Sequence, residues 1–336
     1  MGDQTSRNIW ILGEQRDGHV ESITHELLTR GRELADKRQG TLTAVILGNG
    51  LREADLQELI ERGADHVLAV EGLLLQTFLP EPSTACLKRL IDERHPEILL
   101  AGATSTGRTL MPCVAIKSNT GLTADCTLLD IEPTTGNLLQ TRPAIGGNIL
   151  ATIKTPRHRP QMATVRPHST PPAPRVPGRK GTIERIAAPA DLPRGRICHA
   201  GFVPSPEEQG LSEADVVVCV GRGIKRAEHI PLARKLAETL GAALGATRDV
   251  VDRGWLDYPH QVGLSGKTIA PRLYIGLGIS GAIQHLAGMQ TAGTIIAVNR
   301  DPDAQIFRVA DVGIVGDLFD VIPALIEKFK REKVPS

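Results

Sequence analysis

Short runs of β-branched and aliphatic residues alternate with segments of helical periodicity through the first third of the chain. This alternation constrains the fold more than any other feature. Strand, helix, strand repeated in this way forms a parallel sheet through right-handed crossovers, so an α/β domain is predicted. The predicted strands are Asn8–Leu12, Thr41–Leu47, His66–Val70 and Glu97–Ala101, and the predicted helices are Glu21–Arg38, Glu53–Glu61, Cys86–Glu93 and Gly107–Lys117.

The pattern changes after residue 117, where strand-like pieces are separated by proline and glycine. An antiparallel extension of the first domain is predicted from four such pieces: Cys126–Ile131, Leu138–Gln140, Asn148–Lys154 and Gln161–Val165. The following segment, Arg166–Lys180, holds five prolines and little that can be buried, which is typical of a semi-rigid linker. We therefore predict two domains, 1–190 and 191–336, with a hinge within 166–190.

Alternation resumes in the second half, with strands predicted at Asp215–Val220, Leu273–Leu277 and Thr294–Val298 and a helix at Glu228–Leu240. A second, doubly wound α/β domain is expected from this pattern.

Three glycine-rich turns in this half are the strongest indication of a ligand site. They are Gly221-Arg222-Gly223, the loop Gln261–Lys267, and the turn Gly276–Gly281, which precedes a short helix with Ser280 as its expected N-cap. Turns that follow parallel strands meet at one crevice, and free N–H groups at a helix start attract phosphate. A nucleotide site is predicted there. The Gly-x-Gly-x-x-Gly spacing lacks the usual acidic partner at a strand end, so ordinary strand-to-helix turns remain an alternative.

Composition excludes several classes of protein. Lys and Arg number 39 against 38 Asp and Glu, a net charge of +1, and nine aromatic residues give little material for stacking on nucleic-acid bases. The five cysteines form no Cys-x-x-Cys pair, so no metal site or disulfide framework is expected. No apolar run reaches the ~20 residues of a membrane helix, and no hydrolase motif is present. A cytoplasmic protein without membrane insertion is predicted.

The segment Tyr274–Met289 with the following Ile295-Ile296-Ala297-Val298-Asn299 and Gly313–Leu318 resembles the α subunit of electron-transfer flavoprotein. The resemblance reaches back to Gly221-Arg222-Gly223 and Gln261–Lys267, and into the first domain through Gly102-Ala103-Thr104 and Gly121–Cys126. It implies a nucleotide-hydrolase-like first domain and a second domain that carries FAD.

The resemblance also assigns the residues that contact the cofactor. Those expected to bind FAD are Arg222, Thr247, Gln261, Val262, Gly263, Leu264, Ser265, Ser280, Gly281, Ala282, Ile283, Gln284, His285, Asn299, Asp317 and Leu318. Two of these positions, Ser265 and His285, together with Arg248, which follows Thr247, are expected to tune its redox chemistry. Arg248 and His285 would stabilise negative charge on the flavin, His285 as a donor to the C2 carbonyl, and Ser265 would hydrogen-bond N5.

The implied function is a relay of single electrons in a heterodimer with a β subunit, which would hold a second FAD or an AMP. The forms His260–Lys267 and Arg159–His168 resemble the anaerobic members that bifurcate electrons from NADH. The expected partners are an acyl-CoA dehydrogenase or another flavin dehydrogenase and a ferredoxin or quinone-linked acceptor.

Three alternatives remain open at this point. One is a conventional carrier that does not bifurcate. Another is a homo-oligomeric NAD-binding enzyme with a deoxyhypusine-synthase-like fold, although no convincing acid or base is evident. The third is a nucleotide-sensing module without redox chemistry.

Overall fold

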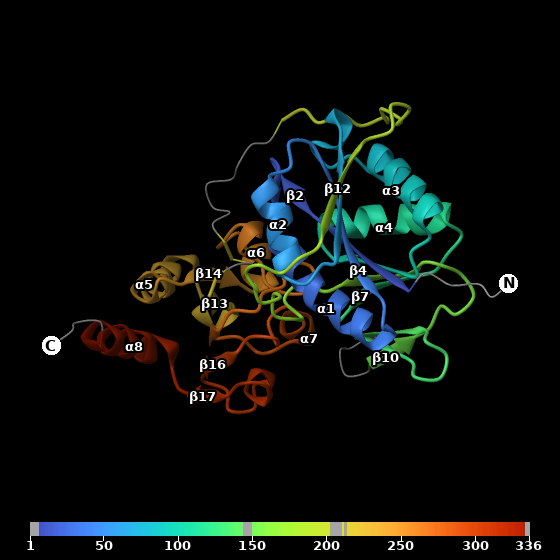
Figure 1. Ribbon diagram of the computed structural model, residues 1–336. Helices are drawn as coiled ribbons and strands as arrows, with labels where there is room; N and C mark the ends of the chain where they lie inside the picture. The colour runs from blue at the N-terminus through green and yellow to red at the C-terminus, as the bar shows by residue number, and fades with distance from the viewer. Residues whose placement is uncertain (1–6, 144–149, 202–209, 212–213, 333–336) are drawn as a thin grey trace. The chain divides into compact units, whose positions relative to one another are not determined.

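The computed structural model describes residues 7–143, 150–201, 210–211 and 214–332. It divides into two compact parts, Met1–Gly201 and Phe202–Ser336, called unit 1 and unit 2 below. Each is built on a parallel sheet flanked by helices, which confirms the predicted α/β class of both halves (Figure 1). The division falls later in the chain than the predicted boundary at 190/191.

Unit 1 contains a seven-stranded parallel sheet in the order β12-β5-β4-β1-β6-β11-β7. Its strands are β1 (Asn8–Gly13), β4 (Thr41–Gly48), β5 (His66–Glu71), β6 (Ile98–Gly102), β7 (Leu122–Cys126), β11 (Gln161–Val165) and β12 (Thr182–Ala187). Its helices are α1 (Ile23–Arg38), α2 (Glu53–Glu61), α3 (Pro80–Arg94) and α4 (Ser105–Lys117), and a small hairpin is formed by β2 (Gln15–Arg16) and β3 (His19–Val20). The predicted helix Glu53–Glu61 coincides with α2.

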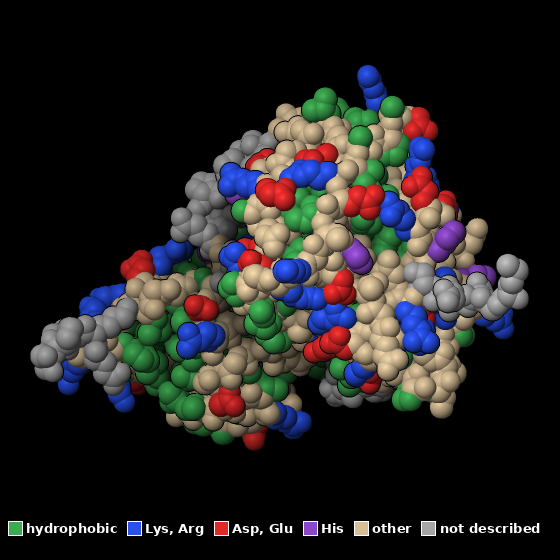
Figure 2. Space-filling view, viewed as in Figure 1, with side chains coloured by type: hydrophobic (Ala, Val, Ile, Leu, Met, Phe, Trp, Pro, Cys, Tyr) green, Lys and Arg blue, Asp and Glu red, His purple; other side chains and the backbone are tan. Residues whose placement is uncertain are grey.

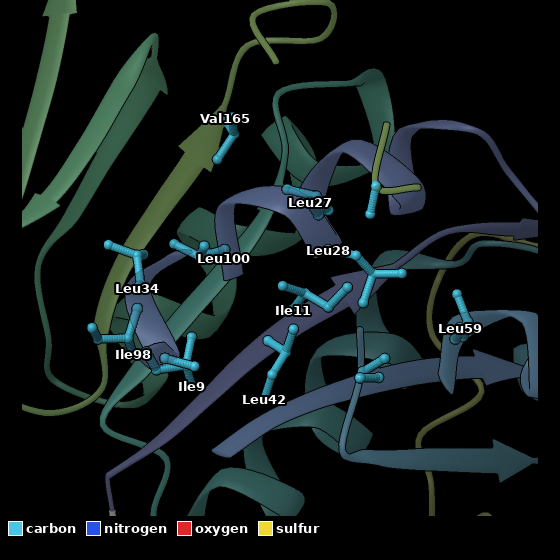
Figure 3. Close-up of a cluster of buried hydrophobic side chains, with 14 of the residues drawn as sticks. Ile9, Ile11, Leu27, Leu28, Leu34, Leu42, Leu59, Ile98, Leu100 and Val165 are labelled. Atoms are coloured by element: carbon cyan, nitrogen blue, oxygen red, sulfur yellow. The ribbon is translucent and has the colours of Figure 1, made fainter. Parts of the chain in front are cut away.

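The two faces of this sheet carry separate hydrophobic clusters. Ile9 and Ile11 of β1 point to the cluster that α1 and α2 cover, which Figure 3 shows with Leu27 and Leu42. The next residue along, Trp10, points to the opposite cluster under α3 and α4. Successive strand residues alternate between faces, so a strand buried on both sides reads as the continuous apolar run seen in the sequence.

The antiparallel extension is a three-stranded sheet of β8 (Leu128–Ile131), β9 (Leu138–Pro143) and β10 (Leu150–Ile153). The prediction that Gln161–Val165 belongs to it is wrong, because this segment is β11, which lies between β6 and β7 and is parallel to both. Asn148 of the predicted third strand lies outside the described residues.

The prediction of a linker within 166–190 is also wrong. The N–H of Ala173 donates to the carbonyl of His25 at 2.9 Å, and the N–H of Val176 donates to the carbonyl of Glu61 at 2.8 Å. The chain then enters β12, which pairs in parallel with β5 at the edge of the unit 1 sheet. The proline-rich segment is therefore strapped across α1 and α2, and it cannot act as the proposed hinge while these bonds hold.

Unit 2 contains a five-stranded parallel sheet in the order β14-β13-β15-β16-β17. Its strands are β13 (Val216–Val220), β14 (Ala243–Ala246), β15 (Leu273–Leu277), β16 (Thr294–Asn299) and β17 (Val312–Val315), and its helices are α5 (Ile230–Leu240), α6 (Arg248–Asp252), α7 (Ile283–Leu286) and α8 (Leu318–Glu332). Clusters on both sheet faces are buried, one under α5 and α8 and the other beside α7, as expected of a doubly wound sheet.

Positive and negative side chains are interspersed over the face of the molecule in Figure 2. This distribution agrees with the net charge of +1 and gives no extended basic patch on that face. Among the described residues, no helix is both long enough and apolar enough to cross a bilayer.

Candidate functional site

A cavity of unit 2 lies at the carboxyl ends of its strands, where the predicted glycine turns meet. β13 is the first strand, β14 lies on one side of it and β15 on the other, so the chain reverses direction across the sheet between β13 and β15. Such a switch point leaves a crevice between the loops that leave the strands. Here the crevice has a volume of about 870 Å³, near the upper end of the ~300–1,000 Å³ typical of ligand pockets.

The glycine turns create this space because their backbones pack directly against each other. A Cβ on Gly223 would lie 2.6 Å from the Cα of Gly278, and a Cβ on Gly221 would lie 2.5 Å from the carbonyl oxygen of Gly278. Gly278 also has φ +62°, the left-handed region that favours glycine. Side chains at these positions would push the two turns apart.

Four cations line the cavity, and three of them are paired with carboxylates that also line it. Arg222 lies 3.7 Å from Asp249, Arg248 lies 3.2 Å from Asp252, and Lys225 lies 3.6 Å from Asp317. The side chains of Arg222 and Arg248 are about 70% exposed, so these pairs are screened by water and weakly held. The fourth cation is Arg300.

Asp317 also caps the helix that follows it. Its Oδ1 accepts the N–H of Phe319 at 3.0 Å, which holds the pKa of this carboxyl below its usual range, with help from Lys225. The ring of Phe319 in turn lies 4.8 Å from the Lys225 ammonium. Lys225 has φ +71°, unusual for a residue with a side chain, and its place on the wall was not predicted.

One hydroxyl in the site has no hydrogen-bond partner among the residues that the structure describes. Thr247 follows β14 and lines the cavity, yet its buried Oγ1 makes no hydrogen bond. A buried hydroxyl without a partner costs about 1–3 kcal/mol, so a ligand that supplies the missing bond is strongly favoured. Ser265 differs, because its Oγ accepts a bond from the side-chain amide of Gln261 at 3.0 Å.

Asn299 ties two of the lining loops together. Its Nδ2 donates to the carbonyl of Ile279 at 2.8 Å, and its Oδ1 accepts the N–H of Asp301 at 3.0 Å. The residue at the end of β16 thus fixes the turn after β15 in place.

His285 lies on the cavity wall but is 6% exposed. Its Nε2 is 2.7 Å from the hydroxyl of Tyr274, and its Nδ1 is 3.1 Å from the carbonyl oxygen of Val262. Burial lowers the pKa of the imidazole to about 4, so the ring is neutral at pH 7. Both ring nitrogens are engaged within the protein in this geometry, and the role of His285 as a donor to the C2 carbonyl of the flavin stays a prediction.

Most of the predicted contact residues line the cavity. These are Arg222, Thr247, Val262, Gly263, Leu264, Ser265, Ser280, Ala282, Gln284, His285, Asn299, Asp317 and Leu318, and Arg248 joins them. Three predicted residues, Gln261, Gly281 and Ile283, do not line it. Gln261 is buried and holds Ser265 from behind, whereas Gly281 packs so tightly that a Cβ there would lie 2.2 Å from the N of Ile306.

Sequence reasoning missed several lining residues that neighbour the predicted ones. These are Lys225, Asp249, Asp252, Arg300, Asp301 and Gly316, whereas Gly278, Ile279 and the two glycines that flank Arg222 belong to turns that were predicted to form the site. Their common signal is position, since each lies within four residues of a predicted site residue or turn. Ser280 is not the N-cap that was expected, because α7 begins at Ile283 with Ala282 before it.

The chemistry of the lining suits a dinucleotide better than a metal. Within the part of the chain that the structure describes, no three His, Cys, Asp or Glu side chains gather as metal ligands. Exposed cations, glycine backbones and an orphaned hydroxyl are instead the groups that bind phosphates and ribose. Fold and site together define a nucleotide-binding α/β protein.

Comparisons with known proteins identify the family. Residues 9–191 match the electron transfer flavoprotein domain, and residues 210–290 match the electron transfer flavoprotein FAD-binding domain. The chain belongs to the electron transfer flavoprotein α-subunit family. It carries FAD, and the unpartnered Thr247 hydroxyl and the glycine cradle of unit 2 fit that cofactor.

Individual relatives cover nearly the whole chain. Electron transfer flavoprotein subunit alpha of Thermoanaerobacterium thermosaccharolyticum is 47% identical over 330 residues, covering 97% of this chain and 99% of the relative. Protein FixB of Clostridium saccharobutylicum is 43% identical and covers 97% of each chain. Subunit LctC of the lactate dehydrogenase (NAD(+),ferredoxin) of Acetobacterium woodii is 40% identical, covering 95% of this chain and 76% of the relative.

Proposed function

We propose that this chain pairs with a β subunit and relays single electrons between a flavin dehydrogenase and an acceptor. The observation that supports the proposal is the unit 2 cavity, whose lining of cations and glycine turns suits a nucleotide. Its one histidine is neutral and bonded on both ring nitrogens. Such a site retains and tunes a cofactor, and substrate conversion would have to occur in a partner.

The lining residues divide into two roles in this proposal. Arg222, Lys225 and the backbone of the glycine turns hold the pyrophosphate, since Arg222 and Lys225 lie on the segment that follows β13 and line the cavity beside those turns. Arg248 and Ser265 tune the isoalloxazine ring, Arg248 by its charge and Ser265 by its hydroxyl. When bound, FAD supplies the capacity to accept and pass on electrons one or two at a time.

We further propose that the complex belongs to the NADH-dependent, electron-bifurcating kind and works in the cytoplasm. The name of the Acetobacterium woodii relative, which couples NAD+ and ferredoxin, favours this over a conventional carrier for acyl-CoA dehydrogenases. The β subunit would then hold a second FAD, whereas a conventional complex would hold AMP there.

The test is reconstitution of the chain with the β subunit encoded beside it and a count of bound nucleotides. Two FAD per heterodimer, and ferredoxin reduction by NADH only in the presence of a second, higher-potential acceptor, would support bifurcation. One FAD with AMP, and electron transfer without ferredoxin reduction, would favour the conventional carrier. A colourless complex that binds NAD would contradict both.

A further inference from the structure

One carboxylate of the unit 2 cavity lies between two arginines. Oδ2 of Asp249, in α6, is 3.7 Å from Nε of Arg222 and 3.4 Å from Nε of Arg253. Asp249 and Arg222 both line the cavity, whereas Arg253 is not part of the lining. The Arg253 guanidinium instead lies 5.5 Å from the centre of the Trp255 ring. Asp249 therefore has one cationic partner inside the site and another outside it.

The two arginines hold Asp249 unequally. Nε of Arg253 donates a hydrogen bond to the carboxylate from four residues further along the chain, whereas the contact with Arg222 is an ion pair beyond hydrogen-bond distance. The Arg222 side chain is 73% exposed, against 47% for Arg253. An exposed ion pair contributes little to stability, so Arg222 can leave Asp249 at small cost. Asp249 keeps a positively charged partner when it does.

Asp249 and a pyrophosphate are rival partners for Arg222. A guanidinium only donates, and both a carboxylate oxygen and a phosphate oxygen accept from it. Because Asp249 lines the same cavity, its negative charge also repels an anion that lies beside Arg222. A carboxylate in this position should lower the affinity of the site for FAD, which is the opposite of the effect of a direct contact.

We propose that Asp249 limits the affinity of the site by competing with the pyrophosphate of FAD for Arg222, and that Arg253 weakens this competition by holding the same carboxylate from outside the cavity. Asp249 is then a positioning residue that acts on FAD through Arg222. The competition requires Arg222 to meet the pyrophosphate, as the proposed function places it. Loss of the Asp249 charge should tighten FAD binding, and loss of Arg253 should weaken it.

The first experiment measures the FAD dissociation constant of Asp249→Asn in complex with the β subunit, by flavin fluorescence titration after removal of FAD. Asparagine keeps the size of the side chain and removes its charge. We expect the dissociation constant to fall about two- to fivefold, the scale of one exposed ion pair. The gain should shrink as added salt screens the charges. A merely structural role of Asp249 in α6 would give no gain, and an unchanged or weaker affinity overturns the proposal.

The second experiment tests the outer arginine with Arg253→Gln. Without Arg253, Asp249 pairs with Arg222 alone, so FAD should bind about twofold more weakly. In an Asp249→Asn background the same substitution should have no effect, because the carboxylate that links Arg253 to the site is gone. Equal losses in both backgrounds would mean that Arg253 acts through its own charge or through Trp255, and would overturn the proposal.

Arg222→Ala separates this proposal from the placement of Arg222 at the pyrophosphate. Unchanged FAD affinity in Arg222→Ala would contradict that placement and the competition together. Weaker FAD binding in Arg222→Ala, without a gain from Asp249→Asn, would overturn the competition alone. The Arg253 comparison keeps Arg222 in place, so it decides the proposal even if Arg222→Ala abolishes FAD binding.

Asp252→Asn is the matched control for a general effect of charge. Asp252 also lines the cavity, but its ion pair is with Arg248, at 3.2 Å. In an Arg222→Ala background the gain from Asp249→Asn should vanish, whereas the effect of Asp252→Asn should be the same as with Arg222 present. A gain from Asp249→Asn that persists without Arg222 would overturn the proposal.

Discussion

Both units have a parallel sheet with a switch point beside the first strand of that sheet, but the residues around the two switch points differ. In unit 1 the switch point lies between β1 and β6, and Glu14, which follows β1, reaches Thr104, which follows β6. Its Oε1 accepts a bond from the Thr104 hydroxyl at 2.6 Å and would lie 3.2 Å from a Cβ on Gly102. In unit 2 the switch point lies between β13 and β15 and is open, with the Thr247 hydroxyl unpartnered.

This difference shows that sheet topology creates a crevice and that the side chains around the crevice determine whether it can bind a nucleotide. At the unit 1 switch point the Thr104 hydroxyl donates to Glu14, and burial raises the pKa of the Glu14 carboxyl. Unit 2 leaves cations exposed and a hydroxyl without a partner. Fold alone would have assigned a nucleotide to both.

The largest expected effect comes from closing the open crevice with Gly278→Ala. The new Cβ would lie 2.7 Å from the Cα of Gly223, so the two turns must separate. We expect loss of bound FAD and about 3 kcal/mol of lost stability. Equilibrium denaturation and flavin absorbance measure both.

Gly241→Ala is the matched control for that variant. Gly241 has a similar φ of +66° but nothing within 4 Å of a Cβ. It should cost about 1 kcal/mol from backbone strain and leave FAD in place. Equal effects from both variants would mean that the close approach of the turns is unimportant.

The enclosed carboxylates of unit 1 should make its stability depend on pH. Burial raises the pKa of Glu26 to about 7, so the folded state holds a proton that the unfolded state releases near 4.5. Stability contributed by this group is present below pH 4.5, falls as pH rises and levels off above 7. The loss should reach about 2–3 kcal/mol. Denaturation followed by Trp10 fluorescence in a Trp255→Phe background at pH 5 and 8 tests this, and Glu26→Gln should flatten the difference.

Removal of the unpartnered Thr247 hydroxyl should stabilise the FAD-free protein but weaken FAD binding. Thr247→Val removes an unsatisfied buried group, so FAD-free protein should gain up to about 1 kcal/mol, while FAD should bind about fivefold more weakly. Thr84 in α3 of unit 1 has an equally unpartnered buried hydroxyl. Thr84→Val should match the stability gain and leave FAD binding unchanged. Weaker binding in both variants would argue against a contact at Thr247.

The smallest expected effect concerns the exposed cations. Arg248→Ala should lower the first reduction potential of FAD, because the reduced anion loses electrostatic stabilisation. We expect a loss of about 0.5–1 kcal/mol, which is small because the Arg248 side chain is 70% exposed. Arg222→Ala should weaken FAD binding and leave the potential unchanged. Redox titration of both variants tests this. If Arg222→Ala alone shifted the potential, the roles assigned to Arg222 and Arg248 would be wrong.

Much of this architecture could be predicted from periodicity. The strand Leu273–Leu277 was predicted with its observed bounds because it is a short apolar run between turn residues. Arg166–Lys180 was misjudged because composition counts prolines but cannot reveal that the N–H groups between them bond to α1 and α2. Gln161–Val165 was misplaced because a strand does not encode its partners when both faces are buried.

The site could be predicted in outline and not in its proton positions. Residues adjacent to glycine turns were found because parallel strand ends converge. The state of His285 depends on Tyr274, which lies on a different element, and on burial that the sequence does not state. The sequence therefore predicts a donor at His285 without showing that Tyr274 and Val262 contact its two ring nitrogens.

The account rests on the claim that FAD occupies the crevice of unit 2 and leaves that of unit 1 empty of nucleotide. Hydrogen–deuterium exchange on the complex with the β subunit, with and without FAD, tests this directly. We predict slower exchange at 221–223, 262–265 and 278–285 and no change at 13–15 and 102–107. Protection at the strand ends of unit 1, or none in the unit 2 turns, would contradict the account.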